Sequence, residues 1–199
     1  MNIIKKYIPI YTLRRSGQKL SAIKFIVAHD TGNLDSTALQ NVDYFIRSAD
    51  EIEASAHVFV DDINIIECIP QDEKAWHVRK NLPTDNLLFG GNANDNSLGI
   101  ELCYFTDLER SKLAYKQYVE YIKSLCQKYN LNPAQAIIGH FTLDPTRRTD
   151  PINAFYRIGK KWIDFLEDLK EKKQPGKKTD FFTILDTFWS NIISYFRGR

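Results

Sequence analysis

The sequence predicts an α/β domain with a mixed central β-sheet flanked by helices, followed by a basic linker and a C-terminal amphipathic helix. Short apolar runs rich in Ile and Val are interspersed with longer segments at helical spacing, without strict alternation. The 199 residues suffice for one sizeable core and a short appendage. Near residue 170 the composition changes to lysines interrupted by Pro and Gly. We therefore place one folded domain at 1–169, the linker at 170–179 and the helical tail at 180–199.

Five apolar runs have the length and the β-branched content of buried strands. They cover residues 23–29, 55–60, 63–69, 98–104 and 136–140. The first and the last of these runs each end at a histidine. A strand holds a side chain in place while its end opens to a cleft, so strand ends in α/β sheets often present functional groups.

Helices are predicted between these strands and after them. Ser36 or Thr37 can cap a first helix, and a long amphipathic helix follows near 107–129. Pro151 suits the first turn of one last domain helix. The apolar residues that this last helix is expected to bury are Phe155, Ile158, Trp162, Phe165 and Leu169. Residues 70–97 contain many turn formers and are expected to form a long loop, which in compact domains is often functional.

The tail separates its apolar and polar residues completely when residues 180–197 are placed on a helical wheel. We expect this helix to dock on the preceding domain or on a second copy of the chain. A membrane surface is the alternative, because lysines precede the helix. Asp180 and Asp186 on its polar face argue against attraction to anionic lipid.

Composition excludes some classes of protein. The 27 Lys+Arg against 25 Asp+Glu leave a formal charge of +2, which does not select nucleic acid as a partner. The cysteines Cys68, Cys103 and Cys126 are odd in number and form no C-x-x-C pair, so we expect buried, reduced thiols rather than disulfides or a zinc ribbon. The N-terminal segment has no secretory apolar region, and no run is long enough to span a bilayer.

Two histidines and an aspartate form a candidate metal site. His29 and His140 end two separate apolar runs, and Asp150 follows ten residues after His140. Two imidazoles and a carboxylate, with a fourth position open to water, are a typical catalytic zinc set. Each histidine by itself is more often a satisfied structural residue, so both interpretations stay open on spacing alone.

Five stretches in order carry a resemblance to a known family. They are IVAHDTGN around His29, SAHVFVDD around His57, AWH at 75–77, NSLGIEL ending near Glu101, and GHFTLDPTRRTDPINAF at 139–155. In these stretches the sequence resembles the N-acetylmuramoyl-L-alanine amidase type 2 family, whose fold is shared with peptidoglycan-recognition proteins and phage amidase endolysins. The resemblance spans roughly residues 23–160.

The resemblance implies a role for each matching residue. His29, His140 and Asp150 would be zinc ligands, and Glu101 would be the catalytic acid/base. Zinc lowers the pKa of water to about 7 and polarises a carbonyl, and Glu101 would carry the proton from water to the leaving amine. Arg148 would stabilise the oxyanion. The family commonly has lysine there, and arginine keeps the charge but cannot transfer a proton. The alternative is that Arg148 is a surface cation that pairs with Asp144 or Asp150.

The strand at 98–104 places Glu101 on one face together with Gly99 and Cys103. The opposite face, with Ile100 and Leu102, is expected to point to the core. For Glu101 the alternative is a carboxylate that faces solvent, and Cys103 is interpreted as packing.

Three further residues are candidates for substrate binding: His57, Trp76 and His77. The indole of Trp76 would pack on sugar or peptide methylene groups. His57 and His77 could instead hydrogen-bond to a ligand side chain, or be structural.

The expected function is therefore hydrolysis of the amide between N-acetylmuramic acid and L-alanine in peptidoglycan, by a phage or prophage endolysin or an autolysin. The protein would be made in the cytoplasm without a signal peptide and act on the cell wall after release by a holin-type or other route. One alternative is a recognition protein that binds peptidoglycan without cutting it. Another is a cytoplasmic amidase that recycles wall fragments.

Overall fold

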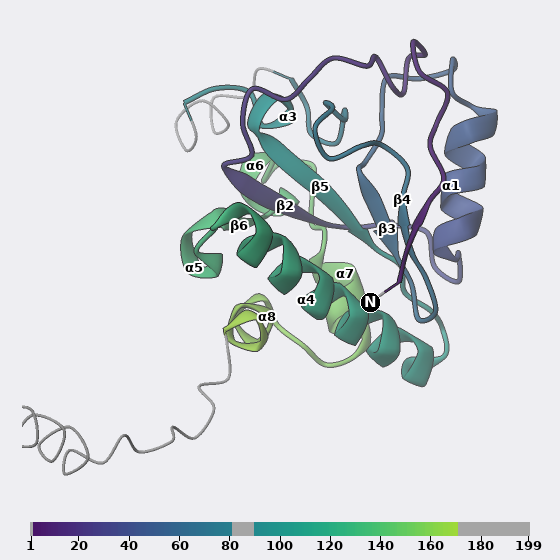
Figure 1. The fold of residues 1–199 in the computed structure, drawn as a ribbon. Coiled ribbons are helices and arrows are strands. Elements are labelled where there is room, and N and C mark those ends of the chain that lie inside the picture. Colours follow the sequence, from purple (N-terminus) through teal and green to yellow (C-terminus); the bar gives the residue numbers. More distant parts are fainter. Residues whose placement is uncertain (1, 81–89, 171–199) are drawn as a thin grey trace, which may run out of the picture.

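The computed structural model describes residues 2–80 and 90–170 of the chain (Figure 1). The amphipathic tail predicted at 180–199 and nearly all of the linker lie outside these residues. The described residues form one six-stranded sheet with the order β1-β4-β3-β5-β2-β6. The strands are β1 (Ile3–Lys5), β2 (Phe25–Asp30), β3 (Val58–Val60), β4 (Ile65–Glu67), β5 (Ser97–Leu102) and β6 (Ile137–Gly139).

The sheet is mixed, as the sequence predicts. β3 and β4 are antiparallel, and every other neighbouring pair is parallel. The antiparallel pair is joined by a turn in which Asp61 Oδ1 accepts hydrogen bonds from the backbone N–H groups of Ile63 and Asn64. An Asp that satisfies the turn in this way explains why two short apolar runs here form a hairpin.

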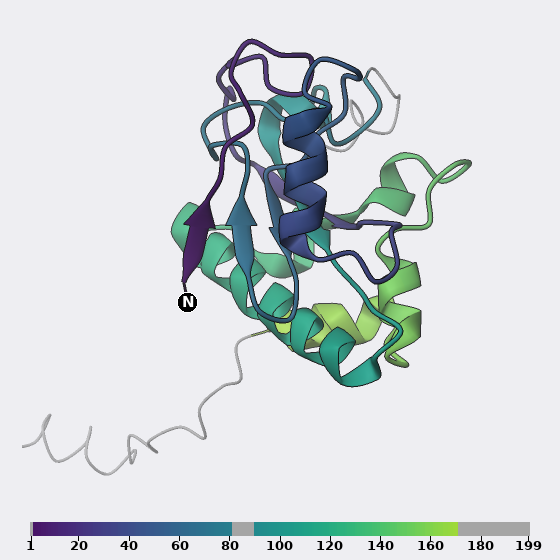
Figure 2. The same cartoon turned by 90° about the vertical axis from the view of Figure 1, so that its right-hand side faces the viewer.

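Helices cover both faces of the sheet. The described helices are α1 (Ala38–Arg47), α3 (Ala93–Asn96), α4 (Leu108–Tyr129), α5 (Pro133–Ala136), α6 (His140–Leu143), α7 (Ile152–Arg157) and α8 (Trp162–Leu169). The long helix α4 crosses one face with α8 beside it, and α1 stands on the other (Figures 1 and 2). Thr37 caps α1 in a capping box: its hydroxyl accepts from the N–H of Gln40, and the side-chain oxygen of Gln40 accepts from the N–H of Thr37.

The single last helix predicted from Pro151 is wrong, because the segment forms two helices. Gly159 has φ +72, a left-handed conformation that ends α7, and the N–H of Lys160 bonds back to the carbonyl of Phe155. Helix α8 then starts afresh, with Asp164 accepting from the N–H of Lys161. Of the apolar residues expected here, Phe155, Phe165 and Leu169 are fully buried, and the others are partly buried against the same core.

Other boundaries also differ from those predicted. His140 is the first residue of α6 rather than the end of a strand, and His57 directly precedes β3 rather than lying within it. The loop expected at 70–97 includes the short helix α3. Strand β1 was not predicted, because an exposed edge strand of three residues has no buried face to produce a pattern.

The interior on the side of α4 is apolar, and the cysteines are free thiols. Cys68, Cys103 and Cys126 are free and buried, as predicted. No helix among the described residues is long and apolar enough to cross a membrane.

Candidate metal centre and its cleft

The candidate site lies at the carboxyl ends of β2, β5 and β6. In the parallel pair β2–β5, His29 is in register with Glu101, so both side chains leave the same face of the sheet. In the pair β2–β6, Ala28 is in register with Gly139, so His140 follows β6 beside His29. Because the carboxyl ends of parallel strands meet at one edge, residues 29, 101 and 140 converge there.

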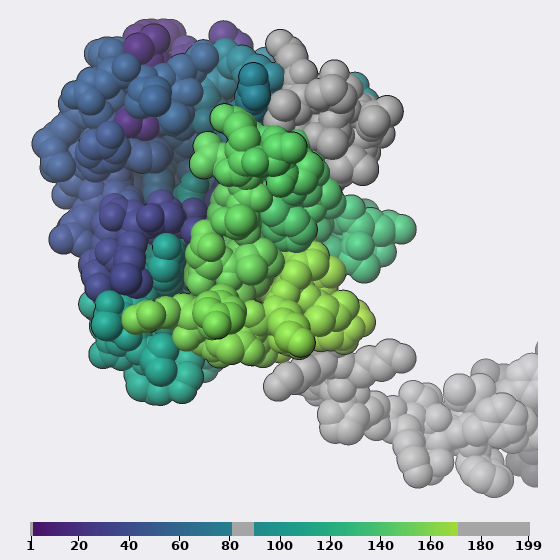
Figure 3. Space-filling view, turned by 180° about the vertical axis from the view of Figure 1, so that it is seen from behind, coloured from purple at the N-terminus to yellow at the C-terminus, as the bar shows by residue number. Residues whose placement is uncertain are grey.

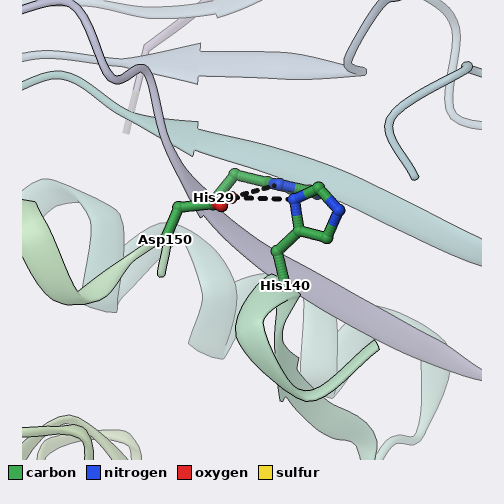
Figure 4. Close-up of side chains that lie close together, drawn as sticks. All are labelled: His29, His140 and Asp150. Atoms are coloured by element: carbon green, nitrogen blue, oxygen red, sulfur yellow. Dashed lines mark hydrogen bonds and ion pairs between the residues drawn. The ribbon is translucent and has the colours of Figure 1, made fainter. Parts of the chain in front are cut away.

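The ligand atoms of His29, His140 and Asp150 lie within 4.8 Å of one another (Figure 4). The Nδ1 atom of His29 is 2.9 Å from Asp150 Oδ2, and the Nδ1 atom of His140 is 3.0 Å from that same oxygen. Zinc–nitrogen bonds of about 2.0 Å in a tetrahedral site separate neighbouring ligand atoms by roughly 3.3 Å. The spacing of the three side chains therefore fits one small cation.

Asp150 is held in place from β2. Asp30, the last residue of β2, accepts hydrogen bonds from the N–H of Gly32 and from the N–H of Ala154 in the first turn of α7. The carbonyl of Asp150 also accepts from the N–H of Phe141 in α6. These bonds tie the segment before α7 to the strand end that carries His29.

The protonation states at this site suit cation binding. Burial lowers the pKa of His29 to about 4, so its imidazole is neutral near pH 7. For Asp150, burial raises the pKa, but the interactions with His140 and His29 outweigh it and hold the pKa well below its usual range. A neutral imidazole and an ionised carboxylate are the forms that bind metals.

Glu101 lines the cleft in a partly buried position, with its Oε2 atom hidden from solvent. Its Oε2 atom has no hydrogen-bond partner among residues 2–80 and 90–170. Burial, followed by the charges of Asp150 and Asp30, raises the pKa of Glu101 well above its usual range, and Arg148 opposes that rise. A buried carboxyl group with a spare oxygen can take and release a proton.

A cleft of about 390 Å³ opens over these residues. Its walls come from the segment after β2, from 53–55, from 76–79 and from 147–153. In Figure 3 the green segment that leads into α7 stands against the purple and blue N-terminal segments, and the cleft follows the boundary between them.

Arg148 is exposed on the cleft wall. The side chain of Asp144 pairs with Arg147, the neighbour of Arg148, because the guanidinium of Arg147 donates to the carboxylate of Asp144. From Arg148, Asp144 receives a backbone hydrogen bond, in which the N–H of Arg148 donates to the backbone carbonyl of Asp144. The guanidinium of Arg148 is therefore placed at the cleft without Asp144 as its partner.

Trp76 lines the cleft in a half-buried position. The Nζ atom of Lys80 lies 4.3 Å from the centre of its ring and also pairs with Glu53 at 2.7 Å. The indole is thus braced by a cation–π contact.

All four histidines of the chain belong to one cluster. His77 lines the cleft and contacts His29, since its Nδ1 lies 3.1 Å from His29 Nε2. His57 is fully buried, with Nδ1 accepting from the N–H of Gly99 and Nε2 donating to the carbonyl of Glu73. His57 is not among the described residues that line the cleft.

Sequence reasoning missed three supporting residues: Asp30, Asn94 and Ser97. Asn94 Oδ1 accepts from the N–H groups of His77 and Val78, and its Nδ2 donates to the Val78 carbonyl. Ser97 Oγ lies 3.2 Å from His77 Nε2. The run of asparagines and serine near residue 95 was the available signal, but its partners lie too far away in the chain to infer.

The fold and the donor set together define a candidate metal-dependent hydrolase. The sequence pattern of the N-acetylmuramoyl-L-alanine amidase family matches residues 19–153, and the chain belongs to this family.

Curated relatives agree with this membership, and a solved structure shares the fold. N-acetylmuramoyl-L-alanine amidase BlyA of Bacillus subtilis (strain 168) is 30% identical over 174 residues, which cover 83% of this chain and 46% of the relative. A probable N-acetylmuramoyl-L-alanine amidase of Bacillus licheniformis is 32% identical over 143 residues, covering 71% of this chain and 40% of the relative. The chain thus spans less than half the length of these two relatives. The catalytic domain of XlyA shares the fold, with a TM-score of 0.68 at 24% identity over 85% of this chain and 100% of that domain.

Proposed function

We propose that this chain hydrolyses the amide bond between N-acetylmuramic acid and L-alanine in bacterial peptidoglycan, with zinc held by His29, His140 and Asp150. The observation that carries the proposal is the convergence of these three donor groups beside the buried carboxyl group of Glu101, in one open cleft. Family membership supplies the substrate class.

The donor set fits zinc. Two imidazoles and one carboxylate are a common ligand set of zinc hydrolases, and Asp150 Oδ2 lies about 3 Å from a nitrogen of each histidine. When bound there, zinc would polarise a carbonyl oxygen and lower the pKa of water.

Glu101 is proposed as the proton carrier. Its carboxyl group shares a sheet face with His29 and lines the cleft. A carboxyl group whose pKa is raised well above its usual range is a stronger base, which favours taking a proton from the attacking water and returning it to the leaving nitrogen of L-alanine.

Arg148 is proposed to stabilise the negative charge that develops on the carbonyl oxygen. It is exposed at the cleft, and Asp144 is engaged by Arg147 instead. An arginine cannot exchange a proton at neutral pH, so proton transfer falls to Glu101 alone.

Trp76 is proposed to bind substrate. Its half-buried ring offers an apolar surface for the sugar or the methylene groups of the peptide. His77 also lines the cleft, but its two ring nitrogens are engaged within the protein.

The test is digestion of purified cell walls, with reducing sugars and new amino termini measured together. The wild type, the chelated protein, the chelated protein with zinc restored, and Glu101→Gln are compared. New L-alanine amino termini without reducing sugar, lost on chelation and in Glu101→Gln, support the proposal. Wall binding without cleavage by the zinc-loaded wild type would overturn it in favour of a recognition protein.

A parallel digest of soluble muropeptides separates a wall-lytic amidase from a recycling one. A lytic enzyme releases amino termini from intact walls, whereas a recycling enzyme acts on soluble fragments and leaves walls intact. The second result would contradict the proposed action on the wall while leaving the amide-bond chemistry in place.

A further inference from the structure

A chain of buried hydrogen bonds leads to His29, and the direction of each bond can be assigned. It begins at the Ser97 hydroxyl, whose single proton is donated to the carbonyl of Ala93 at 2.6 Å. Ser97 Oγ must therefore accept at its contact with His77 Nε2, 3.2 Å away. This places a proton on Nε2 of His77.

The assignment passes from His77 to His29. A neutral imidazole with its proton on Nε2 has a lone pair on Nδ1. The Nδ1 atom of His77 lies 3.1 Å from Nε2 of His29, so that nitrogen of His29 is the donor. The neutral form of His29 then has no proton on Nδ1.

The remaining nitrogen of His29 faces an anion. Its Nδ1 lone pair lies 2.9 Å from Asp150 Oδ2, which is itself an acceptor. Two acceptors at this distance repel unless a cation lies between them. The buried bonds thus direct the lone pair of His29 into the candidate metal site.

His77 is held rigidly in this arrangement. Asn94 fixes its backbone N–H, and its ring packs directly on Gly99 of β5. A Cβ atom at position 99 would lie 2.4 Å from Cγ of His77, so only glycine leaves room for the imidazole. The ring of His57, itself fixed by two backbone partners, contacts His77 edge-on at 5.7 Å between centroids.

We propose that His77 is a positioning residue that, through Ser97, keeps the proton of His29 on Nε2 and thereby presents Nδ1 to zinc. The inference rests on the proposed function in taking His29 as a ligand. Metal-binding histidines usually donate their second N–H to a carboxylate, a carbonyl or water. Here the acceptor is a second imidazole, and its own tautomer is set by a serine.

The test uses two variants of nearly equal shape, His77→Asn and His77→Leu. The asparagine oxygen can accept from His29 Nε2 and the leucine methyl group cannot. Zinc affinity is measured by competition with a chromogenic chelator. We expect His77→Leu to bind zinc about 10 to 100 times more weakly than the wild type and His77→Asn to stay within a few-fold. Equal affinities for the two variants, whether both retained or both lost, would overturn the proposal.

A second measurement does not depend on the variants folding. Nitrogen-15 spectra of the histidine rings in the wild type report which nitrogen carries each proton. We expect His29 to be protonated at Nε2 and coordinated through Nδ1 when zinc is added, and His77 to be protonated at Nε2. Zinc coordination through Nε2 of His29, or a His77 proton on Nδ1, would contradict the assignment.

These readouts separate the inference from the proposed function. Zinc affinity and ring tautomers are measured without substrate. A wild type that binds zinc with the expected tautomers but leaves walls uncut would refute the amidase proposal alone. A wild type that cuts walls, with His77→Leu binding zinc as tightly as His77→Asn, would refute the role of His77 alone.

Discussion

The two faces of the central sheet are stabilised in different ways. On the face covered by α4, α7 and α8, the core consists of packed rings, among them Tyr118, Phe155 and Phe165, with ring centroids 4.9 Å apart for the phenylalanines. On the face that carries His29 and Glu101, buried polar groups are joined by directed hydrogen bonds. Neighbouring residues of the same strands serve both faces, because alternate side chains leave a strand on opposite sides.

This difference shows where stability and chemistry reside. Apolar packing depends on volume and tolerates changes of shape only within the space available. A polar network depends on every donor finding an acceptor. Among the described residues, the buried atoms without partners include Glu101 Oε2 and His140 Nε2, both at the candidate site.

Glu101→Gln should separate activity from stability. We expect hydrolysis to fall about 10²- to 10⁴-fold, because the proton carrier is lost. Stability should stay equal or rise, because a buried carboxyl group without a partner costs free energy. Wall digestion and thermal melting of the same preparation check this. Glu109→Gln, on the exposed surface of α4, serves as the control, and a loss of stability only in Glu101→Gln would contradict the contrast.

Phe165→Ala should show the opposite behaviour on the helix-covered face. Phe165 is fully buried and contacts the rings of Tyr115, Tyr118 and Trp162. Removing its ring should lower the free energy of unfolding by about 3–5 kcal/mol. Activity per folded molecule should change little, because the ring does not line the cleft. Denaturant unfolding measures the loss, and Ile163→Ala, an exposed position on the same helix, should change stability by less than about 0.5 kcal/mol.

Acid should destabilise the sheet face that carries His29 and Glu101. Burial lowers the pKa of His57 to about 4, below the value of about 6.5 of an unfolded histidine. Below pH 6.5 the unfolded chain takes up a proton that the folded chain does not, so stability falls as the pH drops from 6.5 to 4. The loss from His57 should approach about 3 kcal/mol.

Chelated protein is used for this measurement, so that zinc release does not contribute. Unfolding is followed at pH 7 and pH 4.5 for the wild type and for His57→Gln. The variant should lose less stability between the two pH values than the wild type does. An equal loss in both would assign the acid sensitivity to other groups.

Arg148→Lys should have the smallest effect. Lysine keeps the positive charge at the cleft, so activity should remain within about tenfold of the wild type. Arg148→Ala removes the charge, and activity should fall about 10²- to 10³-fold if the residue stabilises the oxyanion. Initial rates of amino-terminus release measure both. If Arg148→Ala is as active as Arg148→Lys, Arg148 is a surface cation without a catalytic role.

Much of the fold was predictable because burial leaves a local pattern. The strands around His29 and Glu101 are continuous apolar runs in the sequence, and α4 shows apolar residues at helical spacing. The break at Gly159 was missed because the apolar spacing continues across it, from Phe155 to Trp162. Strand β1 has exposed residues on both faces and therefore gave no signal.

The candidate ligands were predictable in a different way. His29 and His140 end apolar runs, and the family resemblance added Asp150 and Glu101. The structure brings these four side chains together in one cleft, at the edge of the sheet where the parallel strands end. Their roles in zinc binding and proton transfer remain proposals for the experiments above.

The sequence by itself determined the mixed sheet, the long helix and the residues that could bind a metal, because strand and helix periods and donor types are local properties. Only the tertiary structure decided which buried groups are partners. The chain from Ser97 through His77 to His29 joins segments up to 48 residues apart. Such contacts depend on how β2 and β5 pair and on the space left by Gly99, and no local pattern encodes either.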